Sequence, residues 1–257
     1  MGTDATRRES DEGDLRAVGA TLDRIHGGLP PDTPWFFRVV LGSRVFLIAT
    51  VVVTVVLGTI AASNPEWLLL VDEPVSEWFR GLIDDGSVAT LVTHLGSPNL
   101  ALALGAIGIT VLWRRCRASA ISLGLLVVSA TVVDIVLKLV VDRPRPNNPV
   151  VGTGLGSFPS GHVIHVVVMF GLVPILLWVL TNSRVYLKIG FSVFGVAVSS
   201  VAVSRVALGA HWPSDVVASF FIGASLLLGA QFLIRSVWAA DRCKVLGLHG
   251  GHEIHSA

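Results

Sequence analysis

Long apolar runs separated by short polar segments fill this sequence from about residue 45 to residue 236. An α-helix needs about 20 apolar residues to cross the hydrocarbon core of a bilayer, and most of these runs approach or exceed that length. We therefore expect six membrane-crossing helices, at 45–62, 87–113, 119–141, 160–180, 186–205 and 215–236. The pattern predicts an all-α, polytopic membrane protein.

The second run contains a break at Gly96-Ser97-Pro98-Asn99. The uninterrupted part after Pro98 would form only ~23 Å of helix, against a hydrocarbon core of ~30 Å. The crossing therefore either begins before Pro98 or is short for the bilayer. Between the first two runs, Trp67 and Trp78 accompany several acids, which predicts an extracytoplasmic loop with an interfacial helix at about 74–84.

Polar segments at both ends set the expected domain limits. Residues 1–43 are predicted to form a mostly disordered cytoplasmic tail with a short helix at about 15–25. Residues 238–257 are predicted to form a second cytoplasmic tail, which places the six-helix domain at 44–237 and its site-bearing part at 134–216.

Composition agrees with a membrane protein and excludes other classes. The chain is 52% hydrophobic and 14% charged, with a mean hydropathy of +0.72, whereas soluble domains contain about 25% charged residues. A net charge of +1 excludes a strongly basic nucleic-acid-binding protein. The two cysteines, Cys116 and Cys243, lack metal-ligand spacing, and we expect no disulfide between them.

The distribution of positive charge predicts the orientation of the chain. Of the 19 Lys and Arg residues, 14 fall on the side that carries both termini. The positive-inside rule therefore places both termini in the cytoplasm of a cell (inner) membrane protein. The remaining five fall on the extracytoplasmic side, and they are Arg80, Lys138, Arg143, Arg145 and Arg205.

Candidate chemistry first appears in residues 203–215, which place Arg205, His211 and Asp215 between two apolar runs. Pro213 fits the first turn of a helix, where a missing N–H costs nothing. Asp215 would then lie in that first turn, one helical turn after His211. A carboxylate there can hold one imidazole nitrogen and leave the other free to attack, as in a triad with histidine as nucleophile.

Two earlier segments add cations and a second histidine on the same predicted side of the membrane. One runs from Lys138 to Arg145-Pro146, and the other is Phe158-Pro159-Ser160-Gly161-His162. A phosphate ester carries about −1.5 to −2 charges near neutral pH, so several cations and N–H donors are needed to bind it. Ser160 is a plausible N-cap, and the helix that follows it would point its N–H groups and positive dipole end at an anion.

Together the three segments read Lys-x6-Arg-Pro, Pro-Ser-Gly-His and Ser-Arg-x5-His-x3-Asp. This combination resembles the signature of the type 2 phosphatidic acid phosphatase (PAP2) superfamily, which also contains the vanadium haloperoxidases. The resemblance covers residues 138–215 and leaves the N-terminal third nearly uncovered. It implies a PAP2-like helical bundle that acts as a lipid phosphate phosphatase.

The resemblance also implies a role for each motif residue. His211 is expected to be the nucleophile that forms a phosphohistidine, with Asp215 fixing its tautomer and His162 acting as general acid. The implied phosphate-binding residues are Lys138, Arg145, Ser160, Gly161 and Arg205. Such a mechanism needs no metal or other cofactor, and it predicts a bell-shaped pH profile.

The roles of several residues near the motifs remain open. Asp134 lies inside a predicted crossing, one turn before Lys138, and we expect it to pair with that lysine, although Asp142 competes for the role. Arg143 is interpreted either as charge on the loop or as an exposed interface residue. His165 either faces the groove or belongs to the core, and His94 can approach the headgroup from the second crossing.

The sequence therefore predicts an integral membrane phosphatase with an extracytoplasmic site and a lipid phosphate or diphosphate as substrate. Undecaprenyl diphosphate is the first expectation, and phosphatidic acid and phosphatidylglycerol phosphate are also possible. A lipid phosphotransferase is an alternative, and a transporter or scaffold with an inactive site is an alternative of another class. A haloperoxidase would be soluble, which this chain is not expected to be.

Overall fold

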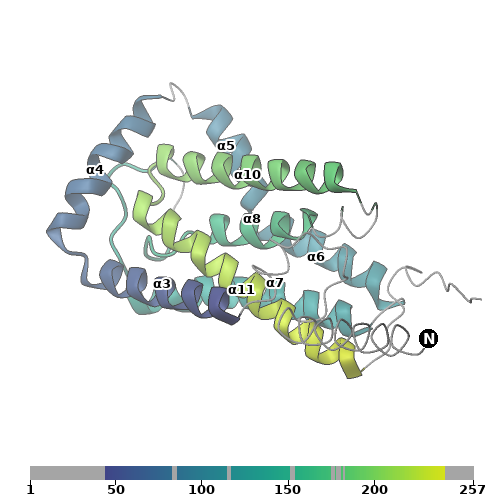
Figure 1. The fold of residues 1–257 in the computed structure, drawn as a ribbon. Coiled ribbons are helices and arrows are strands. Elements are labelled where there is room, and N and C mark those ends of the chain that lie inside the picture. The colour runs from purple at the N-terminus through teal and green to yellow at the C-terminus, as the bar shows by residue number, and fades with distance from the viewer. Residues whose placement is uncertain are drawn as a thin grey trace, which may run out of the picture.

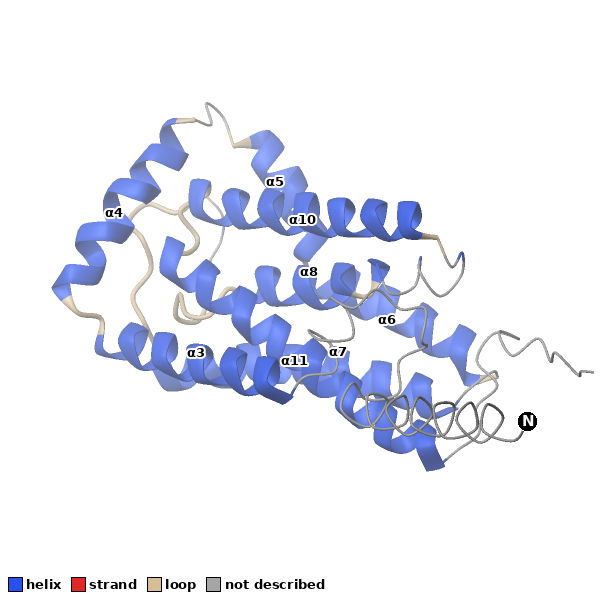
Figure 2. Cartoon of the chain, in the orientation of Figure 1, coloured by secondary structure: helices blue, strands red, loops and turns tan. Residues whose placement is uncertain are grey.

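The computed structural model describes residues 44–82, 86–114, 117–150, 154–174, 177, 181 and 183–240, and in these ranges all regular structure is helical (Figures 1 and 2). The predicted tail at 1–43, its short helix at 15–25 and residues 241–257 lie outside the described residues. The helices are α3 (Arg44–Ser63), α4 (Glu66–Gly81), α5 (Ser87–Thr93), the 3₁₀ helix η1 (His94–Gly96), α6 (Pro98–Trp113), α7 (Arg117–Val141), α8 (Gly161–Gly171), α10 (Arg184–Ala207) and α11 (Pro213–Ala240).

Five segments in the described part of the chain are long and apolar enough to cross a membrane, namely 44–63, 87–113, 120–141, 184–207 and 213–230. They match five of the six predicted crossings. The remaining predicted crossing, at 160–180, contains the shorter apolar helix α8, and part of the chain after it lies outside the described residues.

The second crossing begins before Pro98, which was one of the two predicted alternatives. It consists of α5, η1 and α6, which together span 27 residues. Pro98 occupies the first turn of α6, where its missing N–H is not needed. Ser97 caps this helix by accepting a hydrogen bond from the backbone N–H of Leu100 at 3.3 Å. The break therefore redirects the crossing without ending it.

Helix α4 is longer than predicted, because it starts at Glu66 and not at about residue 74. Pro74 lies inside the helix, which continues through this proline. Asp72 and Ser76 flank Pro74 and are both buried. Contacts on the buried face thus hold the helix on both sides of the residue that would otherwise break it.

Helix α8 is the centre of the bundle. Its residues from Val163 to Val168 are all buried, and all of them except His165 belong to two apolar clusters. One cluster joins α8 to α3, α7 and α11, and the other joins it to α10 and α11. A helix that is apolar all round is stable only when it is enclosed, which explains why neighbouring helices surround α8 (Figure 1).

The outer helices present apolar side chains away from this core. On α3, for example, only Ala61 is buried, while Val45 and Val55 are exposed. Such a surface requires an apolar surrounding, and a bilayer provides it. The chain is therefore a multi-pass membrane protein.

The ends of several helices meet beside α4 at one end of the bundle (Figure 1). The C-terminal ends of α7 and α10 and the N-terminal ends of α8 and α11 lie there, joined by the loops at 142–160 and 208–212. This convergence brings the three sequence motifs together, because each motif lies at one of these helix ends.

Candidate active site

The last turns of α7 hold Lys138 by an ion pair. Lys138 Nζ donates to both oxygens of Asp134, at 2.7 and 2.8 Å, and both side chains are largely buried. The predicted pairing is confirmed, and the competing acid Asp142 is exposed. An ammonium carries three N–H donors, so Lys138 retains one for another acceptor.

The start of α8 provides a second group of donors. Ser160 is the N-cap residue, as predicted, but its side chain makes no capping hydrogen bond. Its Oγ is buried without a hydrogen-bond partner, while its backbone N–H donates to Ser219 Oγ at 2.7 Å. The backbone N–H of Val163 donates to Ser160 O at 3.1 Å, whereas those of Gly161 and His162 have no hydrogen-bond partner among the described residues. A small anion at this helix end would satisfy these groups.

The end of α10 places Arg205 beside the break in the second crossing. Arg205 is 6% exposed, and its Nη1 donates to Thr93 Oγ1 at 3.1 Å. Its Nε is buried and lacks a hydrogen-bond partner. A buried guanidinium N–H without an acceptor is costly, and it indicates that an anion is the missing partner. Thr93 was not predicted to take part in the site.

Arg145 connects two loops of the site. It donates to the carbonyl oxygens of Leu155 and Gly156 on one loop and of Ala210 on the other. Most of its donors are thus used by the backbone. Arg145 therefore contributes mainly positive charge, and it also fixes the loop that leads to His211.

His211 lies within electrostatic reach of all three motif cations, and it is 2% exposed. Burial lowers the pKa of His211 well below its ordinary value of 6.5, and the neighbouring positive charges lower it further. These charges belong to Arg205, Arg145 and Lys138. The imidazole is therefore neutral at physiological pH, which is the form that can act as a nucleophile.

A main-chain carbonyl orients the His211 ring. His211 Nδ1 lies 2.6 Å from the carbonyl oxygen of Ser157. Because a carbonyl oxygen only accepts hydrogen bonds, Nδ1 carries the proton and Nε2 carries the free lone pair. No described residue forms a hydrogen bond with Nε2. This nitrogen is the nucleophilic atom that the site makes available.

The prediction that Asp215 holds an imidazole nitrogen of His211 is wrong in this structure. Asp215 does lie in the first turn of α11, as expected, but its oxygens have other partners. Oδ2 accepts from the backbone N–H of Trp212 at 3.0 Å, and Oδ1 accepts from Arg143 Nη1 at 2.6 Å. Asp215 thus fixes the backbone next to His211 and does not contact the ring through a hydrogen bond.

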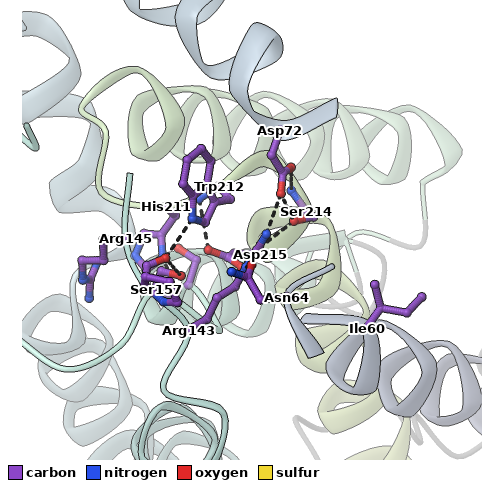
Figure 3. Close-up of polar contacts among 12 residues, drawn as sticks. Ile60, Asn64, Asp72, Arg143, Arg145, Ser157, His211, Trp212, Ser214 and Asp215 are labelled. Carbon is purple, nitrogen blue, oxygen red and sulfur yellow. Dashed lines mark hydrogen bonds and ion pairs between the residues drawn. The ribbon is translucent and has the colours of Figure 1, made fainter. Parts of the chain in front are cut away.

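Arg143 was also misjudged from sequence. It is 1% exposed, so it is neither an exposed interface residue nor free charge on the loop. Besides Asp215, it donates to Asn64, Asp72 and Ser214 (Figure 3). Asp72 on α4 was not predicted at all. Its burial inside a segment with exposed acids gives no signal in the sequence pattern.

The other histidines near the site differ in environment. His165 is a core residue, since its Nδ1 lies 2.7 Å from Gly161 O and its Nε2 lies 3.1 Å from Thr131 Oγ1. His162 is half-buried and within electrostatic reach of Lys138, Arg205 and His94. It therefore lies near two of the three motif cations, and the exposed His94 lies near it as well.

These features define a class of protein. A helical membrane bundle carries, at one end, a buried neutral histidine among three cations and several unpaired donors. This group of cations and donors suits a compact, multiply charged anion such as a phosphate group.

Comparisons with known proteins identify the family. The model of the PAP2 superfamily matches residues 119–240. Phosphatidylglycerophosphatase B of Bacillus subtilis (strain 168) is 30% identical over 145 residues, which cover 54% of this chain and 70% of that protein. A crystal structure of a transmembrane PAP2-type phosphatidylglycerolphosphate phosphatase from Bacillus subtilis matches with a TM-score of 0.61 and 25% identity. That match covers 76% of this chain and 96% of the other chain. The chain belongs to the PAP2 superfamily, and it is a membrane phosphatase that acts on lipid phosphate.

Proposed function

We propose that the protein hydrolyses phosphatidylglycerol phosphate, or a closely related lipid phosphomonoester, through a phosphohistidine formed on His211. The observation that carries this proposal is the oriented, neutral imidazole of His211 among three cations. The names of the two relatives from Bacillus subtilis support the choice of headgroup.

In the first step, Nε2 of His211 attacks phosphorus, and the bond between phosphorus and the lipid oxygen breaks. His162 donates a proton to the departing oxygen, so this oxygen leaves as a neutral hydroxyl group on the lipid. In the second step, His162 removes a proton from water, the resulting hydroxide attacks phosphorus, and the N–P bond breaks. Inorganic phosphate leaves, and His211 returns to its neutral form.

The cations stabilise the charge that the phosphoryl group carries through both steps. Lys138 retains one N–H donor, and Arg205 has a buried unpaired Nε. Ser160 Oγ and the N–H groups at the start of α8 add neutral donors, including that of Gly161. Donors fixed before the reaction need no reorganisation as charge develops, and this preorganisation is a major source of catalysis.

We infer that the site faces the extracytoplasmic side, so that the lipid tail stays in the bilayer while its headgroup reaches His211 and the three cations. The distribution of Lys and Arg along the sequence supports this orientation. The exposed Trp67 and Trp78 of α4 also suit the membrane interface beside the site.

The test is phosphate release by purified protein in detergent, with EDTA present. Phosphatidylglycerol phosphate, phosphatidic acid and undecaprenyl diphosphate are compared, with His211→Ala as the inactive control. We expect the fastest release from phosphatidylglycerol phosphate and none from the variant. Faster release from undecaprenyl diphosphate would return the assignment to the carrier-lipid diphosphatase expected from sequence.

A second measurement tests the covalent intermediate. Labelled substrate is mixed with enzyme and quenched in alkaline detergent, because phosphohistidine is stable in alkali and labile in acid. We expect label on the wild-type protein and none on His211→Ala. Adding an acceptor lipid and analysing the products separates hydrolysis from phosphotransfer, and the absence of both reactions in folded protein would favour an inactive transporter or scaffold.

A further inference from the structure

A buried polar network links α4 to the loop that carries His211, and its centre is Arg143 (Figure 3). Arg143 Nη2 donates to Asp72 Oδ2 at 2.8 Å, and Nη1 donates to Asp215 Oδ1 at 2.6 Å. The side chains of all three residues are at most 1% exposed. We propose that Asp72 and Arg143 are positioning residues for the nucleophile, a role that rests on the proposed function of His211.

Ser214 completes the network on the side of α11. Its Oγ donates to Asp72 Oδ2 at 2.5 Å and accepts from Arg143 Nη1 at 2.8 Å. Its backbone N–H donates to Asp72 Oδ1 at 2.9 Å. The carboxylate of Asp72 thus holds the first turn of α11 through both a side chain and the backbone.

The network reaches His211 through the residue next to it. Trp212 donates its backbone N–H to Asp215, and its Nε1 donates to Pro144 O at 2.9 Å. The Arg143 guanidinium carbon also lies 5.8 Å from the centroid of the Trp212 ring. A displacement of Arg143 would therefore move the backbone that determines where the His211 ring lies.

Helix α4 contacts the same loop a second time, before His211. Gly209 has a φ of +66°, and a side chain there would collide with the guanidinium of Arg80. Arg80 Nη2 also donates to Asn147 O at 2.8 Å. α4 therefore contacts the chain at Gly209 in the loop and at Ser214 in the first turn of α11, on both sides of the nucleophile.

Arg143 acts through other residues and not on the phosphate itself. Its side chain is 0% exposed, and its donors bind Asn64, Ser214, Asp215 and Asp72. Removing one partner from a buried ion pair leaves an uncompensated charge, which relaxes by movement or by taking up water. Because a 1 Å misplacement can cost about 100-fold in rate, a loosened network should slow attack by His211.

The experiment compares Asp72→Asn with two controls in the full-length protein. Glu73→Gln changes the neighbouring acid on α4, which is exposed. Val168→Ala truncates a fully buried core side chain of α8 and supplies a destabilised protein with an unaltered network. The measurements are kcat, KM, the inhibition constant of inorganic phosphate, the melting temperature and the rate of phosphohistidine formation.

We expect Asp72→Asn to lower kcat and the rate of phosphohistidine formation by about 10- to 100-fold. The inhibition constant of phosphate should stay within about twofold, because the cations that bind it lie outside the network. Both controls should keep the wild-type kcat, even though Val168→Ala melts at a lower temperature. A general loss of stability would lower the melting temperature, but it would not lower kcat while leaving the inhibition constant of phosphate unchanged.

The inference is overturned if Asp72→Asn keeps the wild-type kcat, or if Val168→Ala loses as much activity as Asp72→Asn. Should Asp72→Asn fail to fold, Ser214→Ala replaces it, because it removes only one hydroxyl from the network. A several-fold fall in kcat in Ser214→Ala supports the inference, and an unchanged kcat contradicts it. An active His211→Ala would instead contradict the proposed function, so the two failures are distinguishable.

Discussion

The carboxylate of Asp134 lies where a side chain on Gly161 would project. A Cβ on Gly161 would sit 2.5 Å from Asp134 Oδ2 and 2.7 Å from its Cγ. Only glycine at this position therefore allows α7 and α8 to approach while the pair between Asp134 and Lys138 stays intact. Gly161 binds phosphate through its backbone in the proposed site, and its missing side chain also makes room for the ion pair.

Gly161→Ala should therefore displace Asp134 and, with it, the ammonium of Lys138. We expect kcat/KM to fall by at least about tenfold, since the cation would no longer point at the phosphate. Steady-state kinetics with Gly195→Ala as control provide the check, because Gly195 has nothing within 4 Å of its Cβ position. Equal activity of the two variants would contradict this account of Gly161.

Asp134→Asn should reduce catalysis, because the amide keeps the shape of the carboxylate and loses the charge that orients Lys138. The expected loss in kcat/KM is about 5- to 10-fold, from the weakening of a charge-assisted hydrogen bond. Asp142→Asn is a matched control, since Asp142 is one turn after Lys138 and exposed. Similar losses of kcat/KM in both variants would indicate that any negative charge near Lys138 matters, and not the specific ion pair between Asp134 and Lys138.

Thr93→Val should weaken phosphate binding, because it removes the acceptor that holds Arg205 Nη1 without changing the volume of the side chain. A hydrogen bond to a charged group contributes about 1.5–3 kcal/mol, so we expect KM and the inhibition constant of phosphate to rise about tenfold or more. Thr90→Val on the same helix is the control, because no side-chain hydrogen bond of Thr90 is present among the described residues. A wild-type inhibition constant in Thr93→Val would show that Arg205 is oriented by other contacts.

The lowered pKa of His211 predicts how stability depends on pH. As pH falls below about 6.5, the unfolded chain binds a proton on this histidine while the folded protein does not. This residue therefore lowers the free energy of unfolding as the pH falls. The amide of His211→Asn can still donate to Ser157 O. The melting temperature of this variant should fall less than that of the wild type when the pH is lowered from about 7.5 to about 5. Parallel pH curves for the two proteins would contradict a neutral, buried His211.

Those features of the fold that depend on local sequence were predictable. Apolar runs give the crossings because length and hydropathy alone decide whether a helix spans a bilayer. Pro213 predicts the start of α11 because its fixed φ favours the first turn. The pairing of Asp134 with Lys138 was also predictable, since residues four apart share one helix face.

Contacts between distant segments were not predictable from one sequence. The spacing of His211 and Asp215 permits a hydrogen bond between them, but Arg143 and the backbone of Trp212 occupy the carboxylate instead. Arg143 is separated from Asp72 by 71 residues, so no local pattern relates them. The acceptor for His211 is a backbone carbonyl, which every residue possesses, and the identity of Ser157 therefore gave no signal.

That backbone acceptor affects how the site tolerates mutation. A side-chain acceptor is lost in a single substitution, as when a carboxylate is replaced by an amide or an alanine. The carbonyl group that fixes the proton on His211 Nδ1 persists whatever side chain position 157 carries, provided that the loop keeps its path. Genetic change can therefore disable this nucleophile by replacing the histidine or by moving the loop, whereas exchanging its hydrogen-bond partner does not change its tautomer.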